Sequence, residues 1–282
     1  MVRGFAAFVV AWLWCAAAAA DGIPLDADGF TRDIQQRIQN ALPGATVTID
    51  SPLALTVTPR GKAATHTYLD RIYDYCQRMQ GDCEPVVDNF VRVTAKAGQP
   101  DPSYDATNLR AVLRLKAYAD SARNTSPDEP ADFFLARPFA GELVEMCVID
   151  LPDTALLLNA DMFKKLNLDA DAAFARCESN VAASETVPDD GQPVAAHIWV
   201  AAGDYYYSSL PLLHDAWKKR AARGPLLIVV PDPTGLFFAD SDDADTLAAL
   251  ARVAQKGLQM SERPLSAQIL RWTPTGWEVV TP

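Results

Sequence analysis

The sequence predicts an α+β protein whose sheet is largely antiparallel. In the second half of the chain, short β-rich runs come in pairs, and a helical pattern follows each of the first three pairs. A final strand pair closes the chain around the turn Pro274-Thr275-Gly276. Two strands followed by a helix, repeated three times, are typical of an α+β domain built from strand-strand-helix units. A smaller N-terminal lobe of one hairpin and several helices precedes them.

The N-terminal lobe is predicted from hydrophobic spacing and turn signals. Apolar residues from Phe30 to Leu42 recur at helical intervals, and Asp50-Ser51-Pro52 separates two β-rich runs. Gly81 ends a second helical pattern, and Pro85 suits the first turn of a third helix. The expected elements are a helix over 29–41, hairpin strands at 45–49 and 53–57, a helix over 68–79 and a helix from about residue 85.

Two polar stretches that contain proline, near 96–107 and 120–132, flank a strand-like run at 109–118. The second stretch is the best candidate for a mobile linker. We therefore divide the chain into a signal peptide (1–20), an N-terminal α+β lobe (21–107), a strand with a mobile linker (108–132) and a C-terminal strand-strand-helix domain (133–282). Within the last domain we expect strands at 143–151 and 155–158 before a helix at 161–181, strands at 194–201 and 205–207 before a helix at 210–222, strands at 226–230 and 236–239 before a helix at 244–258, and closing strands at 266–272 and 277–280.

The first twenty residues have the three parts of an export signal. Arg3 precedes an apolar run over 5–15, and Ala18-Ala19-Ala20 supplies small residues for cleavage. The run is too short for a good membrane span. The alternatives are an uncleaved anchor and lipidation at Cys15, and the bulky Trp14 just before that cysteine argues against lipidation. We expect a soluble periplasmic or secreted protein with no stable membrane span after cleavage.

The charge balance excludes some partners. The chain of 282 residues carries a net charge of −11, and an acidic surface repels nucleic-acid phosphates and anionic lipid headgroups. No glycine-rich phosphate loop occurs, and the spacing of His66, His197 and His214 matches no zinc motif. The acidic cluster Asp240–Asp245 is explained by a helix start. We therefore expect no nucleic acid, no metal and no cofactor.

The cysteines that remain after signal cleavage are Cys76, Cys83, Cys147 and Cys177. An even number in an oxidising compartment predicts disulfides, although four cysteines allow three pairings. Cys76 and Cys83 flank a turn, so a local bridge between them closes easily. That choice leaves Cys147 with Cys177, and the alternative for this second pair is two buried free thiols.

Several segments together resemble the YtpQ-like family, a bacterial domain of unknown function. The resemblance runs from about Ala45 to the C-terminus and implies the same α+β architecture, but no established activity. The chain departs from the family pattern at two places: Tyr205-Tyr206-Tyr207-Ser208 lacks the family's acidic residue, and Asp232-Pro233-Thr234 replaces the usual residues after Pro231. The segments that carry the resemblance are 109–114, 147–150, 177–181, 203–210, 228–232 and 235–240.

Five residues are candidates for a ligand site, each with a structural alternative. Arg114 could clamp an anion or form a surface ion pair. Asn180 could orient a ligand or cap its helix. Ser208 and Ser209 precede a predicted helix, where they either cap it or help its free N–H groups to bind an anion beside Tyr205.

Two functions follow from these candidates. The first is a binding or protein-interaction module of the cell envelope, which engages an envelope protein, a peptide or a small anionic ligand. The alternative is a hydrolase that uses Ser208 or Ser209 with His197 or His214. The hydrolase would need a serine hydroxyl and a histidine ring within hydrogen-bond reach. The sequence contains no G-x-S-x-G motif that would support it.

Overall fold

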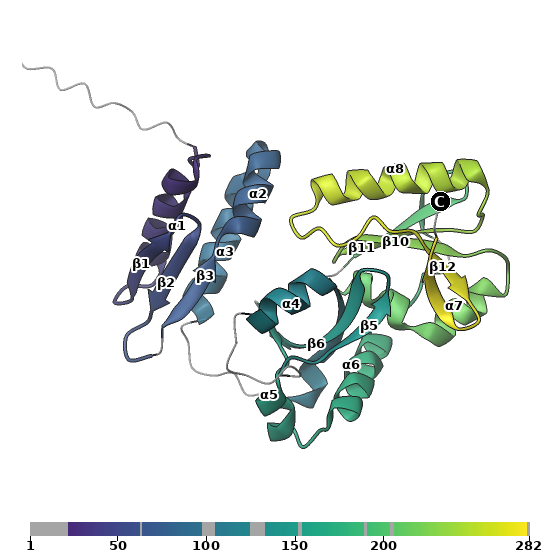
Figure 1. Cartoon of the computed structure of the whole chain (residues 1–282), viewed down its shortest axis with the longest axis horizontal. Helices are drawn as coiled ribbons and strands as arrows, with labels where there is room; N and C mark the ends of the chain where they lie inside the picture. Colours follow the sequence, from purple (N-terminus) through teal and green to yellow (C-terminus); the bar gives the residue numbers. More distant parts are fainter. Residues whose placement is uncertain are drawn as a thin grey trace, which may run out of the picture.

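A computed structural model describes residues 22–62, 64–97, 105–124, 133–151, 154–188, 191–203 and 206–280. The predicted signal peptide, Tyr205 and residues 125–132 of the predicted linker lie outside these ranges. The α+β prediction is confirmed, because the described residues form antiparallel sheets of three, four and six strands with helices packed on them (Figure 1).

The N-terminal lobe contains the predicted hairpin and helices. Its elements are α1 (Ala27–Ala41), β1 (Thr46–Ser51), β2 (Ala54–Thr58), β3 (Thr65–Tyr68), α2 (Asp70–Arg78), the 3-10 turn η1 (Gln80–Asp82) and α3 (Cys83–Ala97). The Asp26 side chain accepts a hydrogen bond from the Gly29 N–H at 2.7 Å and so caps α1. Phe30, Ile34 and Ile38, spaced by helical turns, are fully buried. Strand β3 was not predicted, since its short polar run carries no hydrophobic alternation.

The four-stranded sheet begins with β4 (Leu109–Leu115), which follows the turn η2 (Ala106–Asn108). Strand β4 pairs with β6 over its whole length, from Leu109 opposite Ile149 to Leu115 opposite Leu143. The predicted segment 108–132 therefore begins with a strand of this sheet. The remaining elements are α4 (Lys116–Asn124), β5 (Ala136–Ala140), β6 (Leu143–Leu151), β7 (Thr154–Leu157), α5 (Ala160–Lys165) and α6 (Ala170–Ser184), with the strand order β4-β6-β5 and β7 paired to β6.

Three predictions in this region were wrong in detail. The strand expected to reach 118 ends at Leu115, and helix α4 starts at once. Strand β5 was missed, because Arg137 and Pro138 break its apolar pattern. The helix expected over 161–181 is two helices, since Asn167 between them has a φ of 55°, a left-handed conformation that no α-helix continues through.

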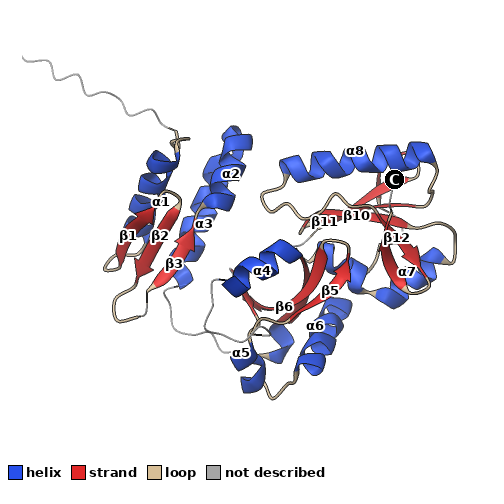
Figure 2. Cartoon of the chain, in the orientation of Figure 1, coloured by secondary structure: helices blue, strands red, loops and turns tan. Residues whose placement is uncertain are grey.

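The six-stranded sheet has the order β13-β12-β10-β11-β9-β8. Its predicted central hairpin and closing hairpin are confirmed, and α8 lies across it (Figure 2). The elements are β8 (Gln192–Ala195), β9 (Ile198–Ala202), η3 (Tyr207–Leu212), α7 (His214–Ala221), β10 (Leu227–Asp232), β11 (Gly235–Ala239), α8 (Ala244–Met260), β12 (Leu270–Thr273) and β13 (Gly276–Val279).

Two expectations for this sheet need correction. The strand expected over 194–201 is a hairpin of β8 and β9, because His197 adopts a φ of 60° at the turn. Tyr206 and Tyr207 form no strand, because the chain turns there into the 3-10 segment η3, which contains Pro211. The predicted helix 210–222 is therefore two elements, the end of η3 and helix α7.

The two larger sheets share one hydrophobic core. Leu113 and Leu143 of the four-stranded sheet pack in the same cluster as Trp217 and Phe238 of the other part. The opposite face of the six-stranded sheet is covered by α8, through residues such as Leu250. The described residues from 105 onward therefore build one body, which the N-terminal lobe contacts through Arg71 and Arg78.

Helix α8 approaches β10 closely at Gly257. A Cβ atom added there would lie 2.8 and 2.9 Å from side-chain carbons of Pro231. We expect Gly257→Ala to lower the free energy of unfolding by about 1 kcal/mol, because overpacking outweighs alanine's better helix propensity. Urea unfolding measures this. Gly81→Ala, where a Cβ would meet open space, is the control, and equal stability of the two variants would contradict the close approach.

Candidate functional site

A groove runs between the N-terminal lobe and the face of the four-stranded sheet. It encloses a cavity of about 630 Å³. One wall comes from α2 and α3, and the other from β4, α4, β6 and β7. Tyr206, Pro233 and the segment 263–265 close the remaining side. The groove is therefore assembled from segments that are far apart in the sequence.

The walls are mostly apolar, but three arginines enter them. Arg71 comes from α2, Arg114 from β4 and Arg263 from the segment after α8. Asp150 is the single acidic residue among the described lining residues. The lining residues thus carry more positive than negative charge, in a chain whose net charge is −11, and Glu262, which is not part of the lining, offsets some of it through contacts with Arg71 and Arg263.

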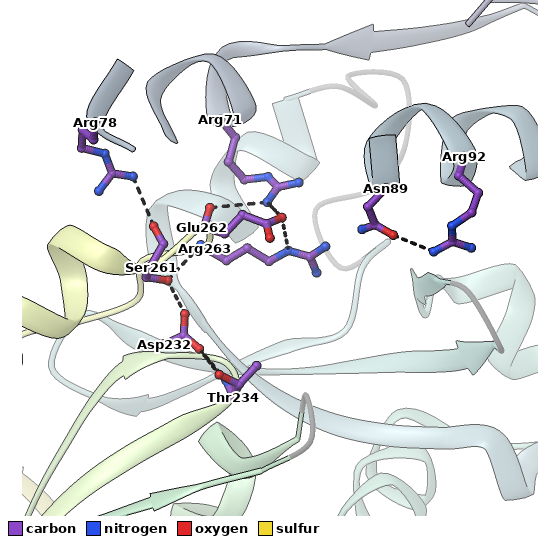
Figure 3. A network of polar contacts seen from close by, with 9 residues as sticks. All are labelled: Arg71, Arg78, Asn89, Arg92, Asp232, Thr234, Ser261, Glu262 and Arg263. Carbon is purple, nitrogen blue, oxygen red and sulfur yellow. Dashed lines mark hydrogen bonds and ion pairs between the residues drawn. The ribbon is translucent and has the colours of Figure 1, made fainter. Parts of the chain in front are cut away.

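Polar contacts across the lobes position two of these arginines (Figure 3). The Arg71 guanidinium lies 3.2 Å from a carboxylate oxygen of Glu262, and the Arg263 Nε lies 3.6 Å from the same oxygen. The Arg263 backbone N–H donates to the Ser261 hydroxyl at 2.9 Å, and that hydroxyl donates to Asp232. One carboxylate therefore lies between two guanidinium groups.

Arg78 holds the end of α8 from the other lobe. Its guanidinium donates to the carbonyl oxygens of Leu258 and Gln259, both at 3.2 Å, and of Ser261 at 3.3 Å. Carbonyls in the last turn of a helix lack intrahelical partners and carry partial negative charge, which a cation stabilises. This contact fixes the end of α8 from which Arg263 emerges.

Strand register explains which side chains face the groove. Arg114 lies opposite Val144 in the β4–β6 pairing, and Val148 and Asp150 follow Val144 at even intervals along β6. Alternate residues of a strand share a face, so these side chains lie on the groove face. The other face packs against α6 through Cys147 and Ile149.

Three of the five predicted site residues do not line the groove, because the sheet separates Asn180 from it and Ser208 and Ser209 are buried. Asn180 lies on α6, and its amide donates to the carbonyls of Ala106 (2.8 Å), Leu109 (2.9 Å) and Thr107 (3.3 Å). It holds α6 against the start of β4, which is a structural role. The predicted cap is also wrong, because α6 continues to Ser184.

The serine prediction also changes. Ser208 and Ser209 are fully buried inside η3, and neither caps a helix: no side-chain cap is formed at η3 or α7. Their hydroxyls have no hydrogen-bond partner in the part of the chain that the structure describes. The histidines contact other groups, since His214 packs on the Trp272 ring and His197 pairs with Asp240 at 2.9 Å. The geometry gives the hydrolase alternative no support.

Because a buried hydroxyl without a partner costs free energy, we expect Ser208→Ala to raise the free energy of unfolding by about 1 kcal/mol. Ser266→Ala is the matched control: Ser266 is equally buried, but its hydroxyl donates to Glu142 and accepts from the Gln268 N–H. The control should be destabilised. Thermal melting of both variants tests this, and a loss of stability in Ser208→Ala would show that the hydroxyl is bonded.

The four described cysteines form one disulfide and one pair of free thiols. Cys76 and Cys83 form the predicted disulfide, with their Cα atoms 4.8 Å apart. The second predicted bridge is not formed, and Cys147 and Cys177 are buried free cysteines. A hydrogen bond to Cys177 and burial raise the pKa of the Cys147 thiol. A nucleophilic cysteine has to be in the thiolate form, which this raised pKa disfavours. The two thiols are therefore a packing contact between β6 and α6.

Beside this pair lies a buried carboxyl group, Glu145. Burial raises its pKa, which the Arg137 guanidinium at 2.6 Å partly offsets. Arg137 also contacts Glu178 and lies over the Phe174 ring, 4.3 Å from its centre. This cluster faces α6 and does not reach the groove.

Among the predicted site residues that the structure describes, Arg114 is the one that lines the groove, and Tyr206 from the predicted tyrosine run lines it too. Arg71, Arg263 and Asp150 were missed, because no local pattern distinguishes them from surface charges. Across the described ranges, no three His, Cys, Asp or Glu side chains gather as a metal site. No described helix is long and apolar enough to cross a membrane.

Comparison with protein-family models gives no match for this chain. Searches among curated proteins and among solved structures give no match either. The resemblance to the YtpQ-like family therefore stays a prediction, and the function has to be argued from the groove itself.

Proposed function

We propose that this chain is an exported binding protein, and that its ligand occupies the groove between the N-terminal lobe and the four-stranded sheet. The observation that carries this proposal is the convergence of Arg71, Arg114 and Arg263 on one apolar groove of an acidic protein. The ligand should combine an apolar body with an anionic group.

The physical basis is the pairing of apolar walls with guanidinium groups. Apolar walls gain about 25 cal/mol for each Å² of apolar surface removed from water. A guanidinium presents planar donors that match a carboxylate or a phosphate, and such charge-assisted bonds are about twice as strong as neutral ones. Both contributions act together only on an amphipathic anion.

The export part of the proposal rests on the residue pattern before Asp21 and on the Cys76–Cys83 disulfide. Structural disulfides persist in oxidising compartments and are rare in the cytosol. N-terminal sequencing of protein recovered from the producing cells should give a mature start near Asp21. A retained residue 1, or a lipid-modified start at Cys15, would contradict a cleaved export signal.

A matched pair of small molecules tests the ligand class. We expect the mature chain to bind 4-phenylbutyrate at least about 10-fold more tightly than 4-phenylbutan-1-ol in isothermal titration calorimetry, because the alcohol lacks the anion that a guanidinium pairs with. Arg114→Ala should remove this preference.

Arg110→Ala is the control for that variant. Arg110 lies on the same strand, and each of the two arginines donates to the carbonyl of the residue before it, but Arg110 does not line the groove. The control should keep the preference for the acid. Equal binding of acid and alcohol, or a preference that survives Arg114→Ala in a protein with unchanged melting, would overturn the proposal.

A further inference from the structure

The two ends of the groove carry opposite charges. Arg114 lies opposite Val144, and Asp150 lies six residues further along β6. At about 3.3 Å per residue, the two positions are roughly 20 Å apart along the strand. Leu265 packs in the same cluster as Leu113 and Leu143, which places the segment of Arg263 at the Arg114 end. The positive end and the negative end are therefore well separated.

Between the ends, the groove is apolar and offers scattered polar groups. Val148 and Leu157 of the sheet and Phe90 of α3 line it. Asn89 and Thr94, also on α3, line the same wall. An apolar chain alone would make no use of these polar side chains, whereas an extended backbone has N–H and C=O groups that need partners.

The acidic end discriminates between two kinds of ligand. A fatty-acid-like anion long enough to fill the groove would place its apolar tail against the half-buried Asp150, and covering a carboxylate with an apolar group costs free energy. A ligand with a cationic group at that end would pair with it. Charge complementarity thus favours a ligand with an anion and a cation about 20 Å apart.

On this basis we infer that the ligand is a short peptide with free termini, bound extended along the sheet face with its carboxylate at Arg114 and its amino group at Asp150. About six extended residues span the required length. This inference rests on the proposed function and names the chemical class of its ligand.

The test uses one apolar hexapeptide in three forms: with free termini, with an amidated C-terminus and with an acetylated N-terminus. Binding to the full mature chain is measured by titration calorimetry. We expect amidation and acetylation each to weaken binding by about 10-fold, because each removes one charged partner. A tripeptide cut from the same sequence should also lose affinity, since it cannot reach both ends.

Variants assign each terminus to its end of the groove. In Arg114→Ala, amidation of the peptide should not weaken binding any further. In Asp150→Asn, acetylation of the peptide should not weaken binding any further. Asp161→Asn makes the same charge change on α5, outside the groove lining, and should behave as the unmodified chain does. Melting curves establish that the variants are folded.

The outcomes separate the two proposals. If acetylation leaves affinity unchanged while 4-phenylbutyrate still binds through Arg114, the peptide inference is overturned and the anion-binding function stands. If neither the peptides nor 4-phenylbutyrate depend on Arg114, both proposals fail. If acetylation weakens binding to the unmodified chain but not to Asp150→Asn, the peptide inference is supported.

Discussion

Trp217→Ala should lower the free energy of unfolding by about 3–5 kcal/mol, the range typical of large aromatic deletions in a core. Trp217 is fully buried on α7, and its ring packs edge-to-face on Trp277 at 5.6 Å and on Phe238 at 6.3 Å. Its indole N–H donates to the Leu210 carbonyl at 2.6 Å. The substitution therefore removes packing between α7 and the six-stranded sheet, and it removes one of the two N–H donors to the Leu210 carbonyl, which keeps the Leu213 backbone N–H.

Urea unfolding followed by circular dichroism measures this loss. Trp217→Phe keeps most of the ring volume but loses the N–H group, so it should be destabilised less than the alanine variant. Trp272→Ala serves as a second control, because Trp272 is only partly buried at the edge of the same cluster. A loss below about 1 kcal/mol for Trp217→Ala would contradict a packed core at this position.

Replacing both Cys76 and Cys83 with alanine should lower the free energy of unfolding by about 2–3 kcal/mol, because the bridge no longer restricts the unfolded chain. The bridge spans a sequence separation of 7 and joins the end of α2 to the start of α3. These helices carry Arg71 and Phe90 to the groove, so ligand binding should weaken as well.

Chemical reduction provides the control for the double variant. Dithiothreitol should destabilise the unmodified chain but leave the double alanine variant unchanged, because Cys147 and Cys177 are not bridged. If the reductant destabilises the variant too, a second disulfide exists in the protein. If it leaves the unmodified chain unaffected, the Cys76–Cys83 bridge contributes nothing measurable.

Local sequence patterns were sufficient to predict most helices and the tight hairpins. The apolar spacing of α1, the turn between β1 and β2, and the hairpin of β12 and β13 each depend on a few neighbouring residues. The local Cys76–Cys83 bridge was predictable for the same reason, since short loops close at small entropic cost. Single residues with a left-handed backbone, Asn167 and His197, caused errors because either residue type also fits a regular element.

The amino-acid sequence alone determined the α+β class, the antiparallel hairpins, the amphipathic helices and the local disulfide, because those features depend on residues near one another in the chain. Only the tertiary structure decided that β4 pairs with β6, that two sheets share a core, and that Arg71, Arg114 and Arg263 line one groove with Asp150 at its far end. The physical reason is that these contacts join segments separated by many residues. Which distant faces meet depends on the packing of the whole chain, and no local spacing records it.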